Sequence, residues 1–311
     1  MSDRWPDIPY EAWQETSEAL HQWLQIVGKY RLAYTPWVNH SWHATFYLSA
    51  RGFDTSVIHC GDKSVQILFD LIDHQLVCSA SDGQSRTLAL GSMSVTAFHE
   101  QFRSLVDDLG VGIDFDGVPN EVADPIPFAD NKAPRPYDAD AVYRFWVAMM
   151  QVDRVFKRFR TGFLGKVSPV HLFWGSFDLA VTRFSGRTAP RHPGGVPALP
   201  DEVTREAYSH EVSSAGFWGG GGGLGFPAFY SYAYPTPEGF ADQAVTPGEA
   251  YFEASLGEYL LPYDAVRNAE DPDETLLGFL QSTYEAAARL GDWDRDALDC
   301  PLGVPRVPRV V

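Results

Sequence analysis

Apolar residues recur at helical spacing in four segments of the chain. In the first, Trp13, Leu20 and Val27 fall seven residues apart on one face, and the pattern stops at Gly28-Lys29. The other three patterns also stop at a glycine, the residue most common just beyond a helix C-terminus. We expect the four helices to cover residues 13–28, 95–110, 139–165 and 272–291.

Two of these helices have clear start signals. Asp271 is a good N-cap, Pro272 suits the first helical position, and Glu274 stands where the acid of a capping box belongs. Asp138 precedes the 139–165 pattern in the same way and is also expected to be an N-cap.

Between the helices the chain has short apolar or alternating runs, which are typical of strands. In the first half these runs cover residues 31–35, 42–50, 65–71, 76–80 and 86–90. In the second half they cover residues 170–184, 208–214, 228–234 and 251–261. Five prolines between residues 119 and 136 interrupt regular structure and predict a linker.

Helix, strands and helix therefore follow one another twice. This order predicts an α+β protein of two related helix-strands-helix halves, with mostly antiparallel sheets and helices packed on them. Gly-Lys pairs at 28–29 and 165–166 precede the long strand of each half, and in such a duplication His43 is the counterpart of Asp178. The expected divisions are a first half over 1–117, a Pro-rich linker over 118–137, a second half over 138–295 and a flexible tail over 296–311.

The charge of the chain bears on its partners. Its 311 residues include 41 acidic and 24 basic side chains, a formal net charge of -17. That field repels nucleic-acid phosphates and anionic membrane surfaces, so neither is expected as a partner. Three dispersed cysteines, with no apolar leader and no apolar run of membrane-spanning length, favour a cytoplasmic location. Cofactor and oligomeric state stay open.

Two histidines lie close together in the polar and aromatic segment 39–43. His40 and His43 could both ligate a metal ion if a turn brings their side chains together. On a regular strand, residues three apart point to opposite faces, and a purely structural role for either histidine is the alternative.

The run 170–187 combines apolar and polar residues. Alternation places Trp174, Ser176 and Asp178 on one face. A carboxylate within such an apolar run needs a partner, because burying a lone charge is costly. If the two long strands pack together, His43 would lie near Asp178, as in an oriented general base or half of a metal site. A structural pair of Asp178 with an arginine or histidine is the alternative.

Further downstream, His210 and Glu211 add a third histidine and an acid, of which only one can face a given cavity. The glycine run 219–225 matches the spacing of a dinucleotide-binding loop, but a strand follows it where that fold needs a helix. We therefore expect a mobile loop there.

Aromatic and basic residues complete the candidate site. Tyr232 belongs to an alternating tyrosine stripe that can wall a pocket or form an ordinary sheet face. Trp174 and Trp218 are candidate walls. Arg183 is a candidate anchor for a ligand anion, with pairing to internal acids as the alternative.

Several longer stretches resemble DUF5996, a bacterial family of unknown function. The matching stretches are residues 32–33, 35–37, 40–43, 168–171, 173–187, 208–218, 261–264 and 279–285. The resemblance spans residues 5 to 293, although the glycine loop lacks a proline associated with the position after Phe217-Trp218. It implies a soluble bacterial protein and no particular activity.

The sequence thus predicts a small-molecule pocket between the two halves, with a metal- or acid/base-dependent reaction as a possibility. The catalytic candidates are His43, Asp178 and His210. The candidates for substrate binding are His40, Trp174, Arg183, Glu211, Trp218 and Tyr232. The alternative function is a non-catalytic binding or scaffold protein whose buried polar residues only hold the halves together.

Overall fold

The computed structural model describes residues 4–309, which form seven α-helices, two short 3-10 helices and two antiparallel sheets. This confirms the α+β class. No helix within the described residues is long and apolar enough to cross a membrane. The helices are α1 (Tyr10–Tyr34), η1 (Asn39–Ser41), α2 (Val95–Asp108), α3 (Ala139–Arg160), α4 (Asp201–Ala207), η2 (Phe240–Asp242), α5 (Tyr263–Arg267), α6 (Pro272–Leu290) and α7 (Arg295–Leu298).

The first sheet is a meander in which strands adjacent in sequence pair in order, β1-β2-β3-β4-β5. Helices α1 and α2 pack on it, and the Trp23 ring of α1 stacks on Phe98 of α2 with 5.0 Å between ring centroids. The strands are β1 (Tyr47–Ser49), β2 (Gly52–Cys60), β3 (Lys63–Asp70), β4 (Gln75–Ala80) and β5 (Ser85–Ala89).

The second sheet has the order β10-β11-β9-β8-β7-β6. Helices α3 and α6 pack on one of its faces and on each other. The strands are β6 (His171–Phe173), β7 (Asp178–Thr188), β8 (His210–Trp218), β9 (Ala228–Tyr234), β10 (Tyr251–Glu253) and β11 (Glu258–Pro262).

Two strands that the sequence predicts as continuous are instead hairpins. The run 170–184 turns back on itself, so that β6 pairs with β7, and Phe177 in the turn has a left-handed backbone with φ of 56°. The run 251–261 likewise divides into the β10–β11 hairpin. A turn without proline leaves little trace in an apolar pattern, which is why the periodicity missed both.

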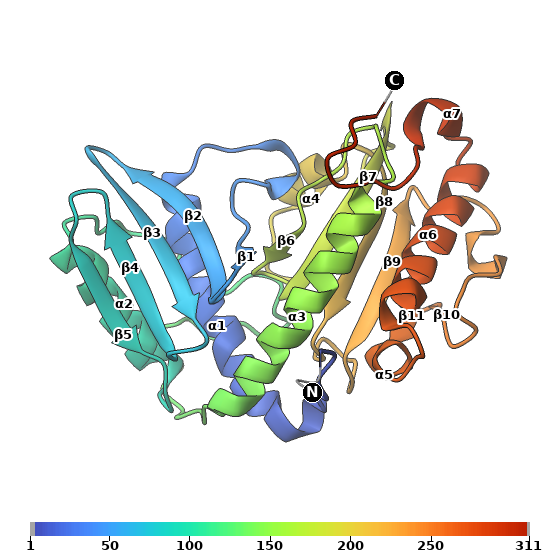
Figure 1. Cartoon of the computed structure of the whole chain (residues 1–311). Coiled ribbons are helices and arrows are strands. Elements are labelled where there is room, and N and C mark those ends of the chain that lie inside the picture. Colours follow the sequence, from blue (N-terminus) through green and yellow to red (C-terminus); the bar gives the residue numbers. More distant parts are fainter. Residues whose placement is uncertain (1–3, 310–311) are drawn as a thin grey trace.

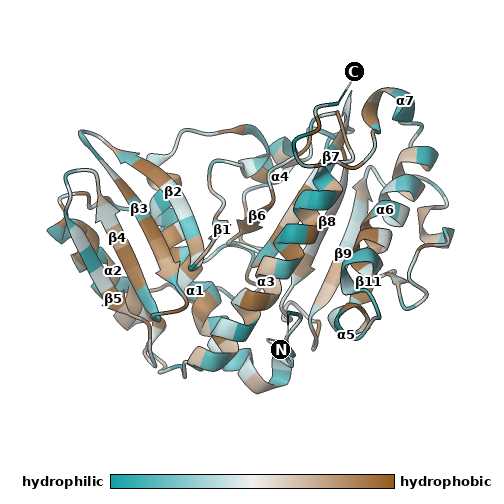
Figure 2. Cartoon of the chain, in the orientation of Figure 1, coloured by the Kyte–Doolittle hydropathy of each residue, from teal (hydrophilic) through white to brown (hydrophobic). Residues whose placement is uncertain are grey.

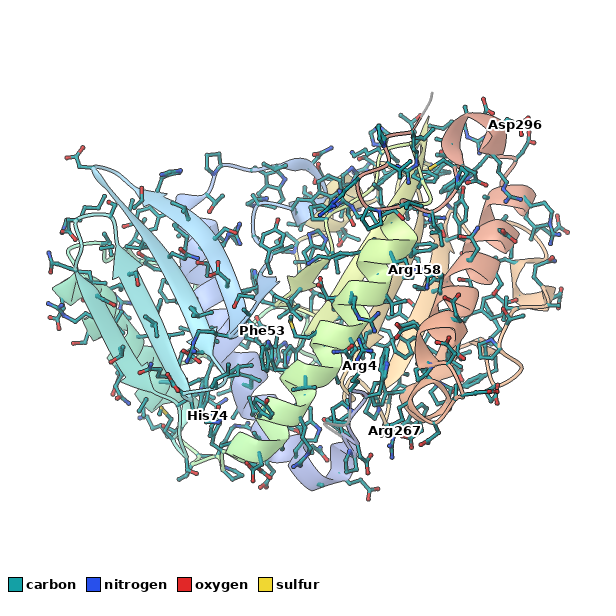
Figure 3. All side chains as sticks on the ribbon, in the orientation of Figure 1. Arg4, Phe53, His74, Arg158, Arg267 and Asp296 are labelled. Atoms are coloured by element: carbon teal, nitrogen blue, oxygen red, sulfur yellow. The ribbon has the colours of Figure 1, made fainter. Side chains whose placement is uncertain are left out.

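The two sheets meet at their edges. Just before β1, Phe46 exchanges two backbone hydrogen bonds with Leu172 of β6, at 2.9 and 2.8 Å. Figure 1 shows the sheets side by side, with α3 lying along the second sheet. The side chains packed between the ribbons include Phe53 of β2, whose ring centroid is 6.3 Å from that of Phe145 in α3 (Figure 3). One apolar core thus runs through both halves.

The starts of α3 and α6 agree with the predictions. Asp138 accepts a hydrogen bond from the Ala141 amide, and Asp271 accepts one from the Glu274 amide. Brown and teal segments interchange along both helices in Figure 2, which reflects one face on the core and one in solvent.

The predicted end of the first helix is wrong. Helix α1 continues through Gly28 and Lys29 to Tyr34, over the segment 31–35 predicted as a strand. Gly28 serves close packing instead, since a β-carbon there would lie 2.5 Å from the Trp174 ring. The second predicted Gly-Lys end also fails, because α3 stops at Arg160. The five-stranded and six-stranded sheets share only a general order of elements, so a duplication stays a prediction.

Candidate functional site

A cavity of about 740 Å³ opens beside the second sheet. It lies on the far side of that sheet from α3 and α6, where the first half and the connecting segments cover the strands. Its walls come from α1, the segment around η1, residues 114–121, the β6–β7 turn, residues 196–208 and strands β7, β8, β9 and β11. The segment predicted as a linker therefore contributes wall residues.

Strand β7 supplies the buried acid of the cavity. Asp178, Ala180 and Thr182 line it, whereas Leu179 and Val181 are buried in the apolar core. This is the face that alternation assigned to Asp178. The polar and apolar faces of β7 are thus separated as the sequence pattern predicts.

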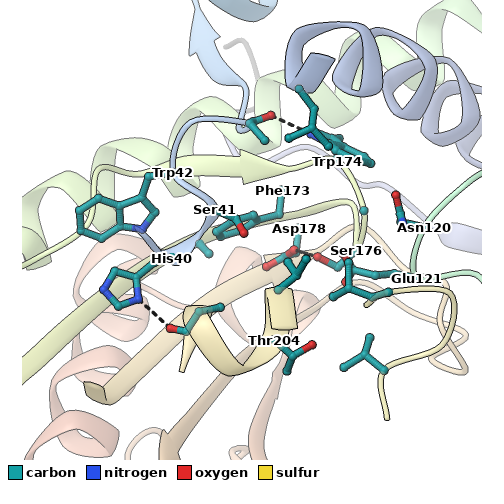
Figure 4. A pocket seen from close by; sticks show the side chains of 18 of the residues that line it. His40, Ser41, Trp42, Asn120, Glu121, Phe173, Trp174, Ser176, Asp178 and Thr204 are labelled. Carbon is teal, nitrogen blue, oxygen red and sulfur yellow. Dashed lines mark hydrogen bonds between the residues drawn. The ribbon is translucent and has the colours of Figure 1, made fainter. Parts of the chain in front are cut away.

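Asp178 is only 4% exposed and has two neutral donors. The hydroxyls of Ser176 and Tyr230 both donate to its carboxylate, and Ser176 and Asp178 group together in Figure 4. Tyr230 reaches Asp178 across β8 because its neighbour there is Gly216, where a β-carbon would lie 2.2 Å from the phenol oxygen. Burial raises the pKa of Asp178, and the two hydroxyl donors oppose that rise.

Two further carboxyl groups line the cavity, Glu121 from the segment between the halves and Glu258 at the start of β11. Burial raises the pKa of Glu121 to about 7 and that of Glu258 to about 8, and the nearby Asp178 carboxylate adds to both rises. The Glu121 side chain is exposed where it borders the cavity. One Glu258 oxygen, Oε2, is buried without a hydrogen-bond partner.

The three carboxyl groups have no basic partner. Across residues 4–309, none of Glu121, Asp178 and Glu258 forms an ion pair with a lysine, arginine or histidine. Sequence reasoning missed Glu121 because it stands in a proline-rich segment, and Glu258 because its position on a short strand carries no distinguishing pattern. The only hint of unpaired acids in the sequence was the excess of 41 acidic over 24 basic side chains in the whole chain.

Lys29 of α1 is the one lysine or arginine among the described residues that line the cavity. It is 3% exposed, and its ammonium lies 2.7 Å from an Asp116 oxygen and 2.6 Å from the Asn120 side-chain oxygen. Burial lowers the pKa of Lys29, and Asp116 opposes this. The charge of Lys29 is therefore matched locally.

Aromatic side chains form a large part of the wall, as ten of the lining residues are Phe, Tyr or Trp. The ring centroids of Trp218 and Tyr230 are 4.4 Å apart, and those of Tyr230 and Tyr232 are 6.1 Å apart. The Tyr232 hydroxyl is in turn 2.8 Å from that of Tyr208. Trp174 lines the cavity as well, with its indole N–H donating to the Ala44 carbonyl at 2.7 Å. Trp174, Trp218 and Tyr232 therefore occupy the wall positions that the sequence suggested.

His40 and His43 also line the cavity, in and just after η1. His40 Nε2 lies 2.6 Å from the Lys166 ammonium, which can only donate, so Nδ1 carries the proton and donates to the Ala207 carbonyl at 2.7 Å. Burial lowers the pKa of both histidines. His43 Nδ1 contacts the Val38 backbone, and Nε2 is buried without a partner. Both imidazoles are thus neutral at pH 7.

Arg183 does not reach the cavity. Its odd position in β7 turns it to the opposite face, where it is fully buried and its guanidinium carbon lies 3.6 Å from the Phe159 ring centre and 4.3 Å from that of Tyr284. It donates to the Phe159 carbonyl at 2.6 Å. The proposed role as a ligand anchor is therefore replaced by a structural one.

His210 and Glu211 also lie outside the residues that line the cavity. His210 Nδ1 contacts the Ser209 hydroxyl at 3.0 Å, and its ring centroid is 5.9 Å from that of His40. Glu211 accepts from Ser185 and forms an ion pair with Arg187 at 2.7 Å. The structure thus brings His43 and Asp178 to one cavity and leaves His210 behind His40.

Among the described residues, no group of three or more His, Cys, Asp and Glu side chains is arranged to hold a metal ion.

Of the comparisons with known proteins, only the one with protein-family models gives a match. The model of the Family of unknown function (DUF5996) matches residues 5–300. No curated protein and no solved structure matches the chain.

Proposed function

We propose that this chain, which belongs to the DUF5996 family, binds a small organic molecule in the cavity beside its second sheet. One observation carries the proposal, a cavity of about 740 Å³ that is lined by aromatic rings and by three carboxyl groups without basic partners, of which Asp178 is buried. Sites for small molecules have volumes of roughly 300–1,000 Å³ and combine apolar walls with a few convergent polar groups. Both properties meet in this cavity.

The alternative is a scaffold in which the polar groups only hold the halves together. Polar groups with such a role are normally satisfied by protein partners when they are buried. Here Glu258 Oε2 and His43 Nε2 are buried beside the cavity without protein partners. These atoms support a site that a ligand completes.

Catalysis by general acid and base is the second candidate, and Glu258 favours it. With a pKa raised to about 8, Glu258 keeps its proton at neutral pH and can donate it to a bound molecule.

Cys60, Cys78 and Cys300 form no disulfide, which supports a reducing, cytoplasmic setting for the proposed activity.

A cavity-filling substitution tests the binding proposal. Thr182 of β7 lines the cavity and is half-buried, so Thr182→Phe places a ring into the space. Thr188→Phe is the matched control, since it makes the same change on the same strand at an exposed position outside the cavity. We expect small molecules that raise the melting temperature of the wild type to do so in the control and not in Thr182→Phe. Equal responses in both variants, or no response from a broad compound library in any of them, would refute the proposal.

A further inference from the structure

The charges around the cavity do not balance. Its lining contains the carboxyl groups of Asp114, Asp116, Glu121, Asp178 and Glu258 and one lysine. Arg103 pairs with the first of these and Lys29 with the second, at 2.7 Å each. Three acids remain without a counter-charge. Asp178 is buried and Glu258 is half-buried. Because carboxylates in such positions are costly unless they are paired, the cavity lacks positive charge rather than negative charge.

The aromatic wall stands next to these acids. The Tyr230 hydroxyl donates to Asp178, and its ring packs against Trp218 and Tyr232. The faces of tryptophan and tyrosine rings carry negative potential and attract ammonium groups within about 6 Å. The acids and the ring faces would therefore both attract a positively charged group of a ligand.

In the free protein, the carboxyl groups of Glu258 and Glu121 bind protons, which neutralise them in the absence of a counter-charge. The pKa of Glu258 is raised to about 8 and that of Glu121 to about 7, so these groups are largely neutral below those values. A cation that entered the cavity would favour their ionised forms and release protons. The titratable and charged groups that surround this space are Lys29 on α1, His40 and His43 at η1, Asp114, Asp116 and Glu121 on the connecting segment, Asp178 on β7, Tyr208 after α4, Tyr230 and Tyr232 on β9, and Glu258 on β11.

We infer that the ligand of this cavity is an organic cation, an amine or quaternary ammonium whose charged nitrogen lies between Asp178, Glu258 and the Trp218–Tyr230–Tyr232 rings. The inference rests on the proposed function and adds the chemical class of the ligand. It also accounts for the buried oxygen of Glu258 that has no partner. Lys29 cannot supply this charge, because Asp116 and Asn120 already hold its ammonium.

The test compares charged ligands with neutral ligands of the same shape. The probes are choline, benzyltrimethylammonium and spermidine, and the neutral partner is dimethylbutanol, the carbon isostere of choline. Binding is followed by calorimetry and by tryptophan fluorescence, since Trp37, Trp42, Trp174 and Trp218 line the cavity. We expect at least one cation to bind and choline to bind about tenfold or more tightly than its isostere. We also expect proton release on binding, measured in buffers of different ionisation enthalpy, and tighter binding as the pH rises from about 6 to about 8.5.

Two isosteric variants locate the charge. Asp178→Asn and Glu258→Gln remove one acid each at nearly constant shape, and each is expected to weaken cation binding about tenfold without weakening the neutral isostere. Glu211→Gln is the control, because it removes an acid on the same sheet outside the cavity. If Asp178→Asn does not fold, Glu258→Gln alone decides, since Glu258 has no basic partner to lose.

The outcomes separate the two proposals. If neutral compounds bind to the wild type but not to Thr182→Phe, and no cation binds, the cavity is a ligand site and the cationic class of ligand is wrong. If cations bind equally well to the wild type, Glu258→Gln and Asp178→Asn, the charge argument is also overturned. If neither cations nor neutral compounds bind, both proposals fail together.

Discussion

Strand β7 buries two charged side chains five residues apart, and their surroundings differ completely. Asp178 faces the cavity, where the Ser176 and Tyr230 hydroxyl groups donate to it and no basic side chain pairs with it. Arg183 faces the core under α3 and α6, where aromatic rings enclose its guanidinium and the Phe159 carbonyl accepts a hydrogen bond from it. Burial lowers the pKa of Arg183 to about 10, so it stays charged at neutral pH.

Arg183 and Asp178 together indicate which buried charges point to a ligand. Arg183 is fully buried among aromatic rings and does not line the cavity, even though its Nε and Nη1 atoms have no hydrogen-bond partner. Asp178 borders the cavity together with two more acids that form no ion pair, which supports the proposed ligand site. A buried charge is therefore evidence for a site when space and an unmatched charge accompany it.

The largest effect is expected for the structural charge. Arg183→Ala removes a long, fully buried side chain from among Phe159, Phe163 and Tyr284 and should lower the free energy of unfolding by about 3 kcal/mol or more. Arg183→Met keeps most of the volume and removes a charge whose Nε and Nη1 atoms lack partners, so we expect a change within about 1 kcal/mol. Urea denaturation measures both. A loss of ligand affinity in the folded Arg183→Met variant would contradict the structural assignment.

Periodicity was enough to place these two side chains on different faces. Positions 178, 180 and 182 share one face of β7, and Arg183 shares the other with Leu179 and Val181. The proposal of Arg183 as a ligand anchor overlooked its odd position. The helix starts at Asp138 and Asp271 were also readable, because capping is a local interaction.

The rest of the site depends on contacts between distant segments. Glu121 and Glu258 meet Asp178 only through the tertiary fold, since one lies in an irregular segment and the other on a short strand. Gly28 likewise lies inside α1 and packs against the Trp174 ring, a contact with a distant segment. Such long-range packing overrides local propensity and leaves no periodic trace.

The second prediction concerns the contact that positions Tyr230 over Asp178. Gly216→Val would place side-chain atoms where the Tyr230 phenol lies and force this ring away from the carboxylate. We expect a loss of about 2 kcal/mol in the free energy of unfolding, together with weaker ligand binding. Gly248→Ala is the control, because a β-carbon there meets no atom within 4 Å. If Gly216→Val binds and unfolds like Gly248→Ala, the Tyr230–Asp178 contact does not shape the cavity.

The third prediction uses the pH dependence of stability. Glu258 has a pKa raised from 4.5 to about 8, so between these values the folded state holds a proton that the unfolded chain has lost. The free energy of unfolding therefore falls as the pH rises through this window, by roughly 1 kcal/mol between pH 7 and pH 8.5 for this one group. Buried His171, with a pKa lowered to about 3, acts in the opposite direction below about pH 6.5, because it stays neutral while the unfolded chain takes up a proton, so its own contribution to stability falls as the pH falls.

Thermal or urea unfolding of the wild type and Glu258→Gln at both pH values measures the contribution of Glu258. The difference between the two proteins cancels the other titrating groups. We expect Glu258→Gln to gain stability relative to the wild type as the pH rises. A constant difference between pH 7 and pH 8.5 would show that Glu258 ionises normally and that the cavity does not hold its proton.

The smallest effect is expected at His210, where the sequence placed a catalytic group and the structure places a half-buried ring outside the cavity. His210→Ala loses a hydrogen bond with Ser209 and an edge contact with the His40 ring, and should change the free energy of unfolding by about 0.5 kcal/mol or less, with ligand affinity unchanged. His43→Ala is the comparison, because it removes a buried ring that lines the cavity and packs 4.6 Å from Trp37. Both are measured by urea denaturation and by calorimetry with the best ligand. A larger loss of affinity in His210→Ala than in His43→Ala would mean that the site extends past His40, and that the cavity wall alone does not define which polar residues act on the ligand.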